Sequence, residues 1–510
     1  MLVHRLPHVL ALLLMGVGLA SCSPSSLNLA PASATTPYNG VAGMPALDKG
    51  TRNFAAAPDP NMPIVVTTPT LNSSTTYSLP QLINIAQLAS PTTRAAWQRA
   101  REAAAATGVA EATYLPVLSA DVLAGFAVTS TTAPGLETEV LDVPIDIPNG
   151  TITTSGVQVV PAIAIEWLLF DFGSRDAALA TSQQLSFAAN LGFTLAHQKL
   201  IFDVSNAYYQ YNAARAQTRI NREALDNVKV VLAAAEAKLK QGLATTMEVA
   251  TAKQQVAQAE FDLTQALGQE RSNQSVLLGA MGVSPLTNIK VQDISGKPLP
   301  SKLPANLDRL IIASLQRRPD VQAAFAQMKA SEQGILAAQA NFMPKVALTG
   351  NLSALLGTYS VDDSRFDADA SLSVAQPNAA VLLGVTLPVF DGGLRESQLQ
   401  SARANAAASA DDFNRLQSTA AQEIVVAYDA LRTSLSGYAA ATQLVDAART
   451  NYEAAVEYYR TGIGTLPETS VTQAGLLKAQ YAQAQARSNA FSAAAALAFA
   501  TGTLTSAQSL

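Results

Sequence analysis

The chain has 510 residues, a net charge of −5 and a single cysteine, and 14% of its residues are charged, against roughly 25% in a typical soluble domain. The acidic balance argues against a general nucleic-acid binder, and one cysteine excludes an intrachain disulfide. After residue 20 no uninterrupted apolar run approaches about 18 residues, so a helical membrane span is not expected in the mature chain. This does not exclude β-barrel strands, in which apolar and polar residues alternate. Only His197 among the histidines lies beyond the N-terminal segment, so we expect neither a metal site nor a cofactor.

The N-terminus is typical of a secretory signal over residues 1–21. Arg5 precedes an apolar run that ends in Leu19-Ala20-Ser21-Cys22. This tetrapeptide resembles a bacterial lipobox, in which the cysteine is lipidated; an ordinary signal with an incidental cysteine is the alternative. Because Ser23 stands where Asp would resemble an inner-membrane retention signal, we expect Cys22 to anchor an outer-membrane lipoprotein. Residues 22–78, rich in Pro, Ser, Thr and Asn, are expected to form an extended leader.

Two halves of the chain follow the same order of elements. Phe170 matches Phe390 and Arg175 matches Arg395, each at an offset of 220 residues, whereas Pro116 matches Pro344 at 228. Eight extra residues must therefore lie between Pro116 and Phe170. The sequence predicts a first repeat at 79–283, a linker at 284–304, a second repeat at 305–503 and a short tail at 504–510.

Each repeat begins with a predicted helix that ends before a proline, because proline cannot continue a helix. These helices cover 90–113 and 318–341. Apolar and polar residues then alternate with period two, which indicates strands. The predicted strands lie in β-hairpins at 116–170 and 344–390; the alternation is clear at 157–169, 345–355 and 381–389 and weaker at 117–128. Their lengths suit tilted membrane-spanning strands of about 9–11 residues.

Aromatic residues mark the helix-proximal ends of these strands. They are Tyr114, Trp167, Phe170, Phe342 and Phe390. Such a set is expected of an aromatic girdle at one membrane interface, and a soluble sandwich packed by aromatics is the alternative. The polar stretches at 129–155 and 357–378, beyond the opposite ends, are expected to be long external loops.

The tripeptide Asp171-Phe172-Gly173 matches the magnesium-binding motif of protein kinases. A kinase also needs a Gly-rich loop and an H-R-D catalytic loop, and neither occurs. The second repeat has Asp391-Gly392-Gly393 at the equivalent place. We interpret both motifs as corners between a strand and a helix, where Asp171 and Asp391 accept free N–H groups while Gly173 and Gly393 permit the turn.

Long helices follow the corners. Residues 174–240 and 394–460 each span 67 positions without proline, about 100 Å of helix, which is typical of coiled-coil packing. Gly242 and Gly462 are expected to close these helices, and Thr245 or Thr246 to cap the first returning helix. The sequence thus predicts helical hairpins at 174–283 and 394–503.

Duplicated halves, F-D-x-G corners, x-G-x-x-T tips and the lipobox together resemble the TolC-type outer-membrane efflux channels, lipoprotein branch, over roughly residues 79–503. The resemblance implies a mixed membrane fold, in which a homotrimer forms a 12-stranded β-barrel in outer-membrane lipid, with four strands per chain. The barrel continues into a periplasmic α-helical coiled-coil barrel. Independently, four strands cannot close a barrel, open edges cannot sit in lipid, and three copies would close one.

The resemblance also implies partners, namely a periplasmic adaptor and, beyond it, an inner-membrane pump. The matching docking positions at the tips are Gly242, Leu243, Thr245, Gly462, Ile463 and Thr465. The alternative is that the glycines only end the helices. The second tip has Pro467 where the first repeat has Met247, so the two tips are not identical. Channels of this kind narrow at acidic residues, for which the candidates are Asp226, Asp446, Glu453 and Glu457. Threefold symmetry would turn each into a charged ring, although charged helical positions are usually solvated faces.

The function implied is a passive exit duct and not an enzyme, since no clustered catalytic motif occurs. A channel for type I protein secretion and a periplasmic coiled-coil adaptor are the alternatives. The adaptor reading fits less well, because adaptors lack four membrane-length alternating strands. The sequence does not indicate the cargo.

Overall fold

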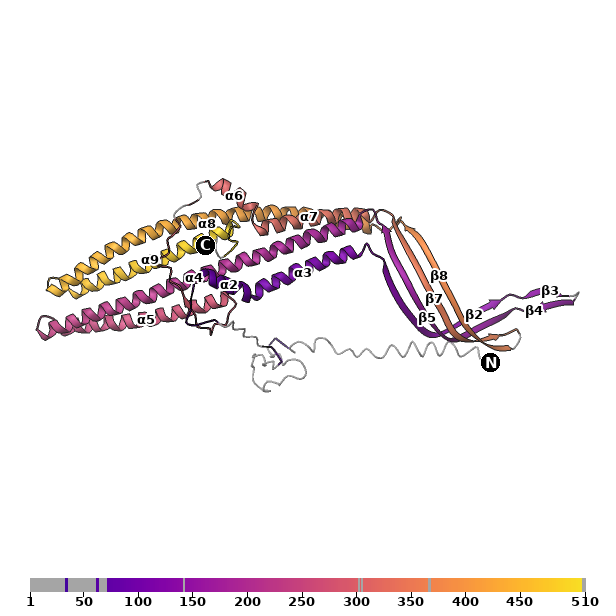
Figure 1. Ribbon diagram of the computed structural model, residues 1–510, viewed down its shortest axis with the longest axis horizontal. Coiled ribbons are helices and arrows are strands. Elements are labelled where there is room, and N and C mark those ends of the chain that lie inside the picture. Colours follow the sequence, from indigo (N-terminus) through magenta and orange to yellow (C-terminus); the bar gives the residue numbers. More distant parts are fainter. Residues whose placement is uncertain are drawn as a thin grey trace. The chain divides into compact units, whose positions relative to one another are not determined.

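The computed structural model describes residues 33–34, 61–63, 71–140, 143–300, 303, 306–365 and 368–506 (Figure 1). All helices and strands given below belong to the unit formed by residues 68–510. Cys22 and most of the expected leader lie outside the described residues.

Helices and strands alternate in two similar series. The helices are α2 (Leu79–Ala89), α3 (Pro91–Ala112), α4 (Ser174–Lys240), α5 (Thr246–Ala280), α6 (Leu307–Leu315), α7 (Pro319–Ala340), α8 (Leu394–Thr461) and α9 (Leu466–Ala500). The strands are β1 (Thr76–Tyr77), β2 (Val117–Ala133), β3 (Leu136–Val140), β4 (Val143–Ile147), β5 (Gly150–Phe170), β6 (Lys290–Val291), β7 (Lys345–Asp363) and β8 (Ala368–Thr386).

Helix α4 has the 67 residues that the sequence predicts, and α8 extends one residue further than predicted. Helix α4 packs against α3, α5, α7 and α9, while α8 packs against α7 and α9. In Figure 1, α3, α4, α7 and α8 all lead to the strands, and α5 and α9 run beside the far halves of α4 and α8. Across the described residues, none of the helices combines the length and apolar character that crossing a membrane requires.

The largest hydrophobic core surrounds the middle of α4. Ile201, Val204 and Tyr209 are each no more than 1% exposed. They belong to one cluster with α2, the end of α5 and the segment after it. Strand β1 pairs with β6 in parallel beside this core. The core therefore ties the segment before the first repeat to the linker between the repeats.

Four strands form one antiparallel sheet in the order β2-β5-β7-β8. Its register places every predicted apolar stripe on a single face. Leu118, Val122 and Phe126 of β2 lie opposite Ile165, Pro161 and Val157 of β5. The same face continues across β7 and β8 through the pairs Ile163–Leu352, Trp167–Leu348 and Leu348–Leu383. The exposed fractions of Val122 (70%) and Leu383 (66%) show that no described part of the chain covers these positions of the face.

A bulge near the end of β5 completes the aromatic set. Trp167 and Phe170 have opposite parity, so a regular strand would place them on opposite faces. The register shifts between Leu168 and Phe170, which brings Phe170 opposite Val346 and onto the face of Trp167. The bulge therefore lets both rings share the apolar face.

The predicted external loops were wrong in large part. Strands β2 and β5 pair continuously to Ala133 and Gly150, and β7 and β8 pair to Asp363 and Ala368. Apolar alternation stops earlier because it reports the surroundings of side chains, whereas the backbone ladder continues through Ser and Thr residues that favour strands. In the first repeat, β3 and β4 form an additional hairpin that has no counterpart among the described residues of the second.

Strand β8 also ends earlier than the apolar stripe predicts. Its last residue, Thr386, pairs with Lys345, the first residue of β7. Beyond this point no strand among the described residues pairs with the chain, and Val389 and Phe390 are each 89% exposed. Strand β8 is an edge of the sheet, as β2 is on the other side.

We expect the substitution Leu352→Arg to be far more harmful than Ser353→Arg. Leu352 lies on the apolar face near the middle of β7, and a charge at the middle of a lipid-facing strand costs about 2–4 kcal/mol. Ser353 lies on the opposite face. Denaturant unfolding in lipid vesicles measures the difference; equal unfolding midpoints for the two variants would show that the apolar face does not contact lipid.

Candidate functional site

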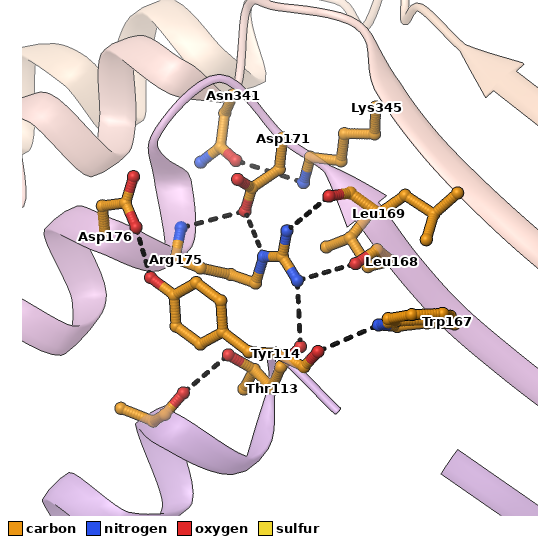
Figure 2. Close-up of polar contacts among 11 residues, drawn as sticks. Thr113, Tyr114, Trp167, Leu168, Leu169, Asp171, Arg175, Asp176, Asn341 and Lys345 are labelled. Carbon is orange, nitrogen blue, oxygen red and sulfur yellow. Dashed lines mark hydrogen bonds and ion pairs between the residues drawn. The ribbon is translucent and has the colours of Figure 1, made fainter. Parts of the chain in front are cut away.

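The first corner joins β5 to α4 through two residues with left-handed backbone. Phe172 has φ 54° and Gly173 has φ 91°. The Asp171 carboxylate, 5% exposed, accepts a hydrogen bond of 2.9 Å from the Arg175 N–H in the first turn of α4. Figure 2 shows this carboxylate directed at the start of α4 and at the Arg175 side chain. The motif thus ends a strand and begins a helix within three residues.

The Arg175 side chain holds three segments together at this corner (Figure 2). Its guanidinium donates to the carbonyls of Leu168 (2.7 Å) and Leu169 (3.1 Å) at the end of β5, and to Thr113 (3.2 Å) after α3. Its Nε lies 3.3 Å from Asp171 Oδ2. The sequence analysis did not predict this role of Arg175. The presence of an arginine at the equivalent position of both repeats, Arg175 and Arg395, was the one feature that could have indicated it.

The Tyr114 ring lies beside Arg175, and Trp167 contacts Tyr114 in turn. The guanidinium lies 4.7 Å from the centre of the Tyr114 ring, and Trp167 Nε1 donates to the Tyr114 carbonyl (2.9 Å). The Tyr114 hydroxyl donates to Asp176, and this hydrogen bond raises the pKa of Tyr114 to about 12. The hydroxyl therefore stays protonated at physiological pH and remains a donor. Two members of the predicted girdle are thus fixed by polar contacts.

The second corner has the same backbone and fewer contacts. Gly392 and Gly393 have φ 68° and 89°, and Asp391 accepts from the N–H groups of Gly393 and Arg395 (3.1 and 3.2 Å). Arg395 Nε lies 2.5 Å from Asp391 Oδ2, and this contact lowers the pKa of Asp391 below its ordinary value. Arg395 also lies 5.2 Å from the centre of the Phe342 ring. Phe342 stands where Tyr114 stands in the first repeat and has no hydroxyl to bond the helix.

The two helical tips have equivalent backbones. Gly242 (φ 73°) donates to Leu239 O and Gly462 (φ 84°) donates to Tyr459 O. The N–H of the next residue reaches one carbonyl further back, from Leu243 to Lys238 and from Ile463 to Tyr458, which is the Schellman closure of a helix. Thr245 and Thr465 then cap α5 and α9 through the N–H groups of Glu248 and Glu468. Pro467 leaves this pattern intact because it lies in the first turn of α9, where no N–H is needed.

Exposed apolar side chains occupy both tips. Leu243 is 72% exposed and Ile463 is 79% exposed. Just behind them, a small core of Val231, Ala235, Val249, Ala252, Tyr459 and Leu466 joins residues from all four helices. The Lys238 ammonium lies 4.0 Å from the centre of the Tyr459 ring. The tips are therefore presented together on one packed support.

The candidate gate residues are exposed in the single chain. Asp226, Asp446, Glu453 and Glu457 all lie on solvent-accessible positions of α4 and α8. Glu457 Oε2 lies 3.7 Å from Arg460 Nη1, a solvated pair on one helix. Among the described residues, none of these four carboxylates forms an ion pair with a side chain of another helix.

We expect Arg175→Ala to lower the stability of the assembled protein by about 2–4 kcal/mol, because it leaves the buried Asp171 carboxylate without its counter-charge and frees three carbonyls. The matched control is Arg415→Ala, whose exposed pair with Asp412 contributes less than about 1 kcal/mol. Thermal dissociation in detergent measures both. Equal losses for the two variants would contradict a bracing role for Arg175.

Comparison with known proteins agrees with this architecture. The family model described as "Outer membrane efflux protein" matches residues 82–283 and 310–503. Protein CyaE of Bordetella pertussis is 26% identical over 79% of this chain and 79% of its own length. The "probable outer membrane lipoprotein SilC" of Salmonella typhimurium is 28% identical over 52% of this chain, which spans about half of that relative (55%).

A solved structure shares the fold. The crystal structure of CusC superposes with a TM-score of 0.68 at 19% sequence identity, and the match covers 88% of this chain and 99% of that one. At this identity the likeness shows the fold alone. The family model, however, matches more than half of the chain. The chain therefore belongs to the outer membrane efflux protein family.

Proposed function

We propose that the protein is the outer-membrane exit duct of a tripartite efflux system, and that it conducts substrate passively from an inner-membrane pump and a periplasmic adaptor to the exterior. The observation that carries the proposal is the four-stranded sheet with a continuous, exposed apolar face, joined through braced corners to helices of about 100 Å. Lipid is the environment that covers such a face without a protein partner.

The working unit of this proposal is a homotrimer. Strands β2 and β8 leave unpaired edges, and unpaired backbone groups are costly in hydrocarbon. Pairing β8 of one copy with β2 of the next would remove every edge, and three copies give 12 strands, an even number as in most such barrels. The same symmetry would arrange the helical hairpins into a tunnel below the barrel.

The helical tips are proposed to dock onto the adaptor. Leu243 and Ile463 are exposed on equivalent, rigidly closed turns, and exposed apolar residues on ordered loops favour a protein partner. The residues proposed to contact the adaptor are Gly242, Leu243, Thr245, Gly462, Ile463 and Thr465. Asp226, Asp446, Glu453 and Glu457 are proposed to form acidic rings at the periplasmic end of the tunnel.

Conductance tests the proposal directly. Purified protein in detergent is expected to migrate as a heat-modifiable trimer and to conduct ions in planar bilayers. A lone subunit without conductance would exclude the duct.

We expect Gly462→Pro to abolish export while trimers still form. Proline fixes φ near −65°, which is incompatible with the left-handed residue that closes α8. The matched control is Gly475→Ala. Gly475 lies within α9, and a methyl group added there has no neighbouring atom within 4 Å. Resistance of cells to an exported compound, measured beside trimer yield, gives the readout. Unchanged resistance with Gly462→Pro would count against tip docking.

We expect Cys22→Ser to remove covalently attached lipid from the mature N-terminus. The lipid anchor is a further part of the proposal, supported by the lipobox-like tetrapeptide and by the lipoprotein description of SilC. Mass spectrometry of the N-terminal peptide detects the acyl groups. An unmodified Cys22 in the unaltered protein would exclude the anchor.

A further inference from the structure

The two hairpins of the four-stranded sheet have the same register. Val117 of β2 pairs with Glu166 of β5, and the equivalent residues of the second repeat, Lys345 and Thr386, pair with each other. The offsets found in the sequence, 228 residues for β2 and β7 and 220 for β5 and β8, therefore hold in the structure. A contact made by one repeat can be transferred to the other by these offsets.

The first repeat contacts the second through β5 and α4. Strand β5 pairs with β7, and α4 packs against α7 and α9. Transferred by one repeat, these contacts would place β2, α3 and α5 beside β8 and α8. In the single chain β8 is an edge of the sheet, and the described helices that pack extensively against α8 are α6, α7 and α9. A second copy of this chain carries β2, α3 and α5 in the required order, so it is the partner that fits this side.

The ladder between β5 and β7 predicts the ladder between β8 and β2 of a partner subunit. Within the chain, Ile165 pairs with Gly350. The equivalent residues are Val385 and the partner's Val122, positions that are 67% and 70% exposed in the single chain. Directly opposite residues of paired strands lie on one face, so this register joins the apolar faces of two copies into one surface.

The same register accounts for the exposed stretch after β8. Following the bulge in β5, Phe170 pairs with Val346. The equivalent residues are Phe390 and the partner's Leu118, positions that are 89% and 69% exposed in the single chain. The partner's β2 would thus lie beside residues 387–390, which pair with no strand among the described residues.

Pairing of this stretch would also complete the second corner. Arg175 bonds two carbonyls at the end of β5, which is held by its ladder with β7. The Arg395 side chain is 13% exposed, and among the described residues Asp391 is its sole hydrogen-bond acceptor. The carbonyls equivalent to those that Arg175 bonds belong to Pro388 and Val389. A partner strand that holds this stretch in place would bring these carbonyls to the Nη groups of Arg395.

Helices α5 and α8 carry exposed apolar residues where the same transfer brings them together. Within the chain, Tyr481 of α9 bonds Asn221 of α4, one turn from Ala224. The residues equivalent to Tyr481 and Ala224 are Phe261 of α5, 57% exposed, and Leu444 of α8, 52% exposed. A polar contact inside the chain would thus be replaced by an apolar contact between copies, which would cover both side chains.

We propose that the contact between the two repeats of one chain is repeated between neighbouring copies. Strand β8 pairs with β2 of the partner subunit, with Val385 opposite the partner's Val122, and α8 packs against the partner's α5, with Leu444 beside the partner's Phe261. This inference rests on the homotrimer of the proposed function and adds to it the register of the strands and the contact between the helices. The closed ring then consists of six equivalent contacts, three within chains and three between them.

Disulfide cross-linking in isolated outer membranes tests the register. The variant is Val122→Cys with Val385→Cys, and the unaltered chain, with Cys22 as its single cysteine, measures the background. We expect oxidation to produce covalently linked trimers in a denaturing gel without reductant. The matched control is Val122→Cys with Val381→Cys. It shifts the pair by four residues, about 13 Å, on the same face, whereas a disulfide requires Cα atoms within about 7 Å.

The outcomes separate the register from the assembly. Links in the control pair and not in the Val122–Val385 pair would overturn the register while the trimer stands, and so would heat-modifiable trimers in which neither pair links. Absence of trimers from the unaltered chain would overturn this inference together with the proposed assembly.

A charge pair tests the contact between the helices. We expect Leu444→Glu to lower the temperature at which the trimer dissociates in detergent, and added Phe261→Lys to restore at least half of the loss, because the two charges would then attract across the interface. The matched control adds Val276→Lys, an exposed apolar residue of α5 that lies roughly 22 Å along the helix from Phe261. Equal restoration by the two lysines, or none by either, would contradict the helix contact.

Discussion

A four-stranded antiparallel sheet has two open edges, and this constraint governs the rest of the molecule. Each edge presents N–H and C=O groups that hydrocarbon cannot satisfy. In this chain, the edges are β2 and β8, and the stretch after β8 continues as exposed apolar residues with no strand beside it. A single chain therefore supplies only part of a closed barrel. This accounts for the exposed apolar face and for the proposed assembly of three copies.

The corners transmit this arrangement to the helices. Arg175 bonds the end of β5 and the residue after α3, and its own helix begins at the same place. The direction of α4 is thus fixed relative to two other elements. At the second corner, Arg395 contacts Asp391 and the Phe342 ring, and the carbonyl bonds of the first corner are not among its contacts. The two repeats share a backbone path but differ in how firmly the corner is braced.

Much of the architecture could be predicted from sequence because its signals are local. Proline ended α3 and α7, and the glycines at the corners and tips take the left-handed backbone that their positions require. The lengths of the strands could not be predicted, because alternation reports the surroundings of the side chains and not the hydrogen bonding of the backbone. The bulge at Leu168–Phe170 was equally hidden, since it depends on the register with β7.

The polar sites were harder to predict than the fold. The acceptors of Arg175 are backbone carbonyls, which leave no trace in the sequence. The contact between α4 and the linker, in which Arg215 donates to Val291 O, was also missed, because it is a tertiary feature. Residue types locate turns well; they do not show which distant segment comes to lie beside them.

The length of the strands beyond the apolar band has a physical consequence for the exit. At about 3.4 Å per residue, the 19 residues of β7 measure roughly 65 Å, or about 45 Å in height when tilted by 45°, while an outer-membrane apolar band is about 25 Å tall. In the proposed assembly the wall would therefore rise some 20 Å above the hydrocarbon as a hydrophilic collar. A molecule leaving the duct would be released past the charged headgroup layer, where apolar compounds would otherwise partition straight back into the membrane.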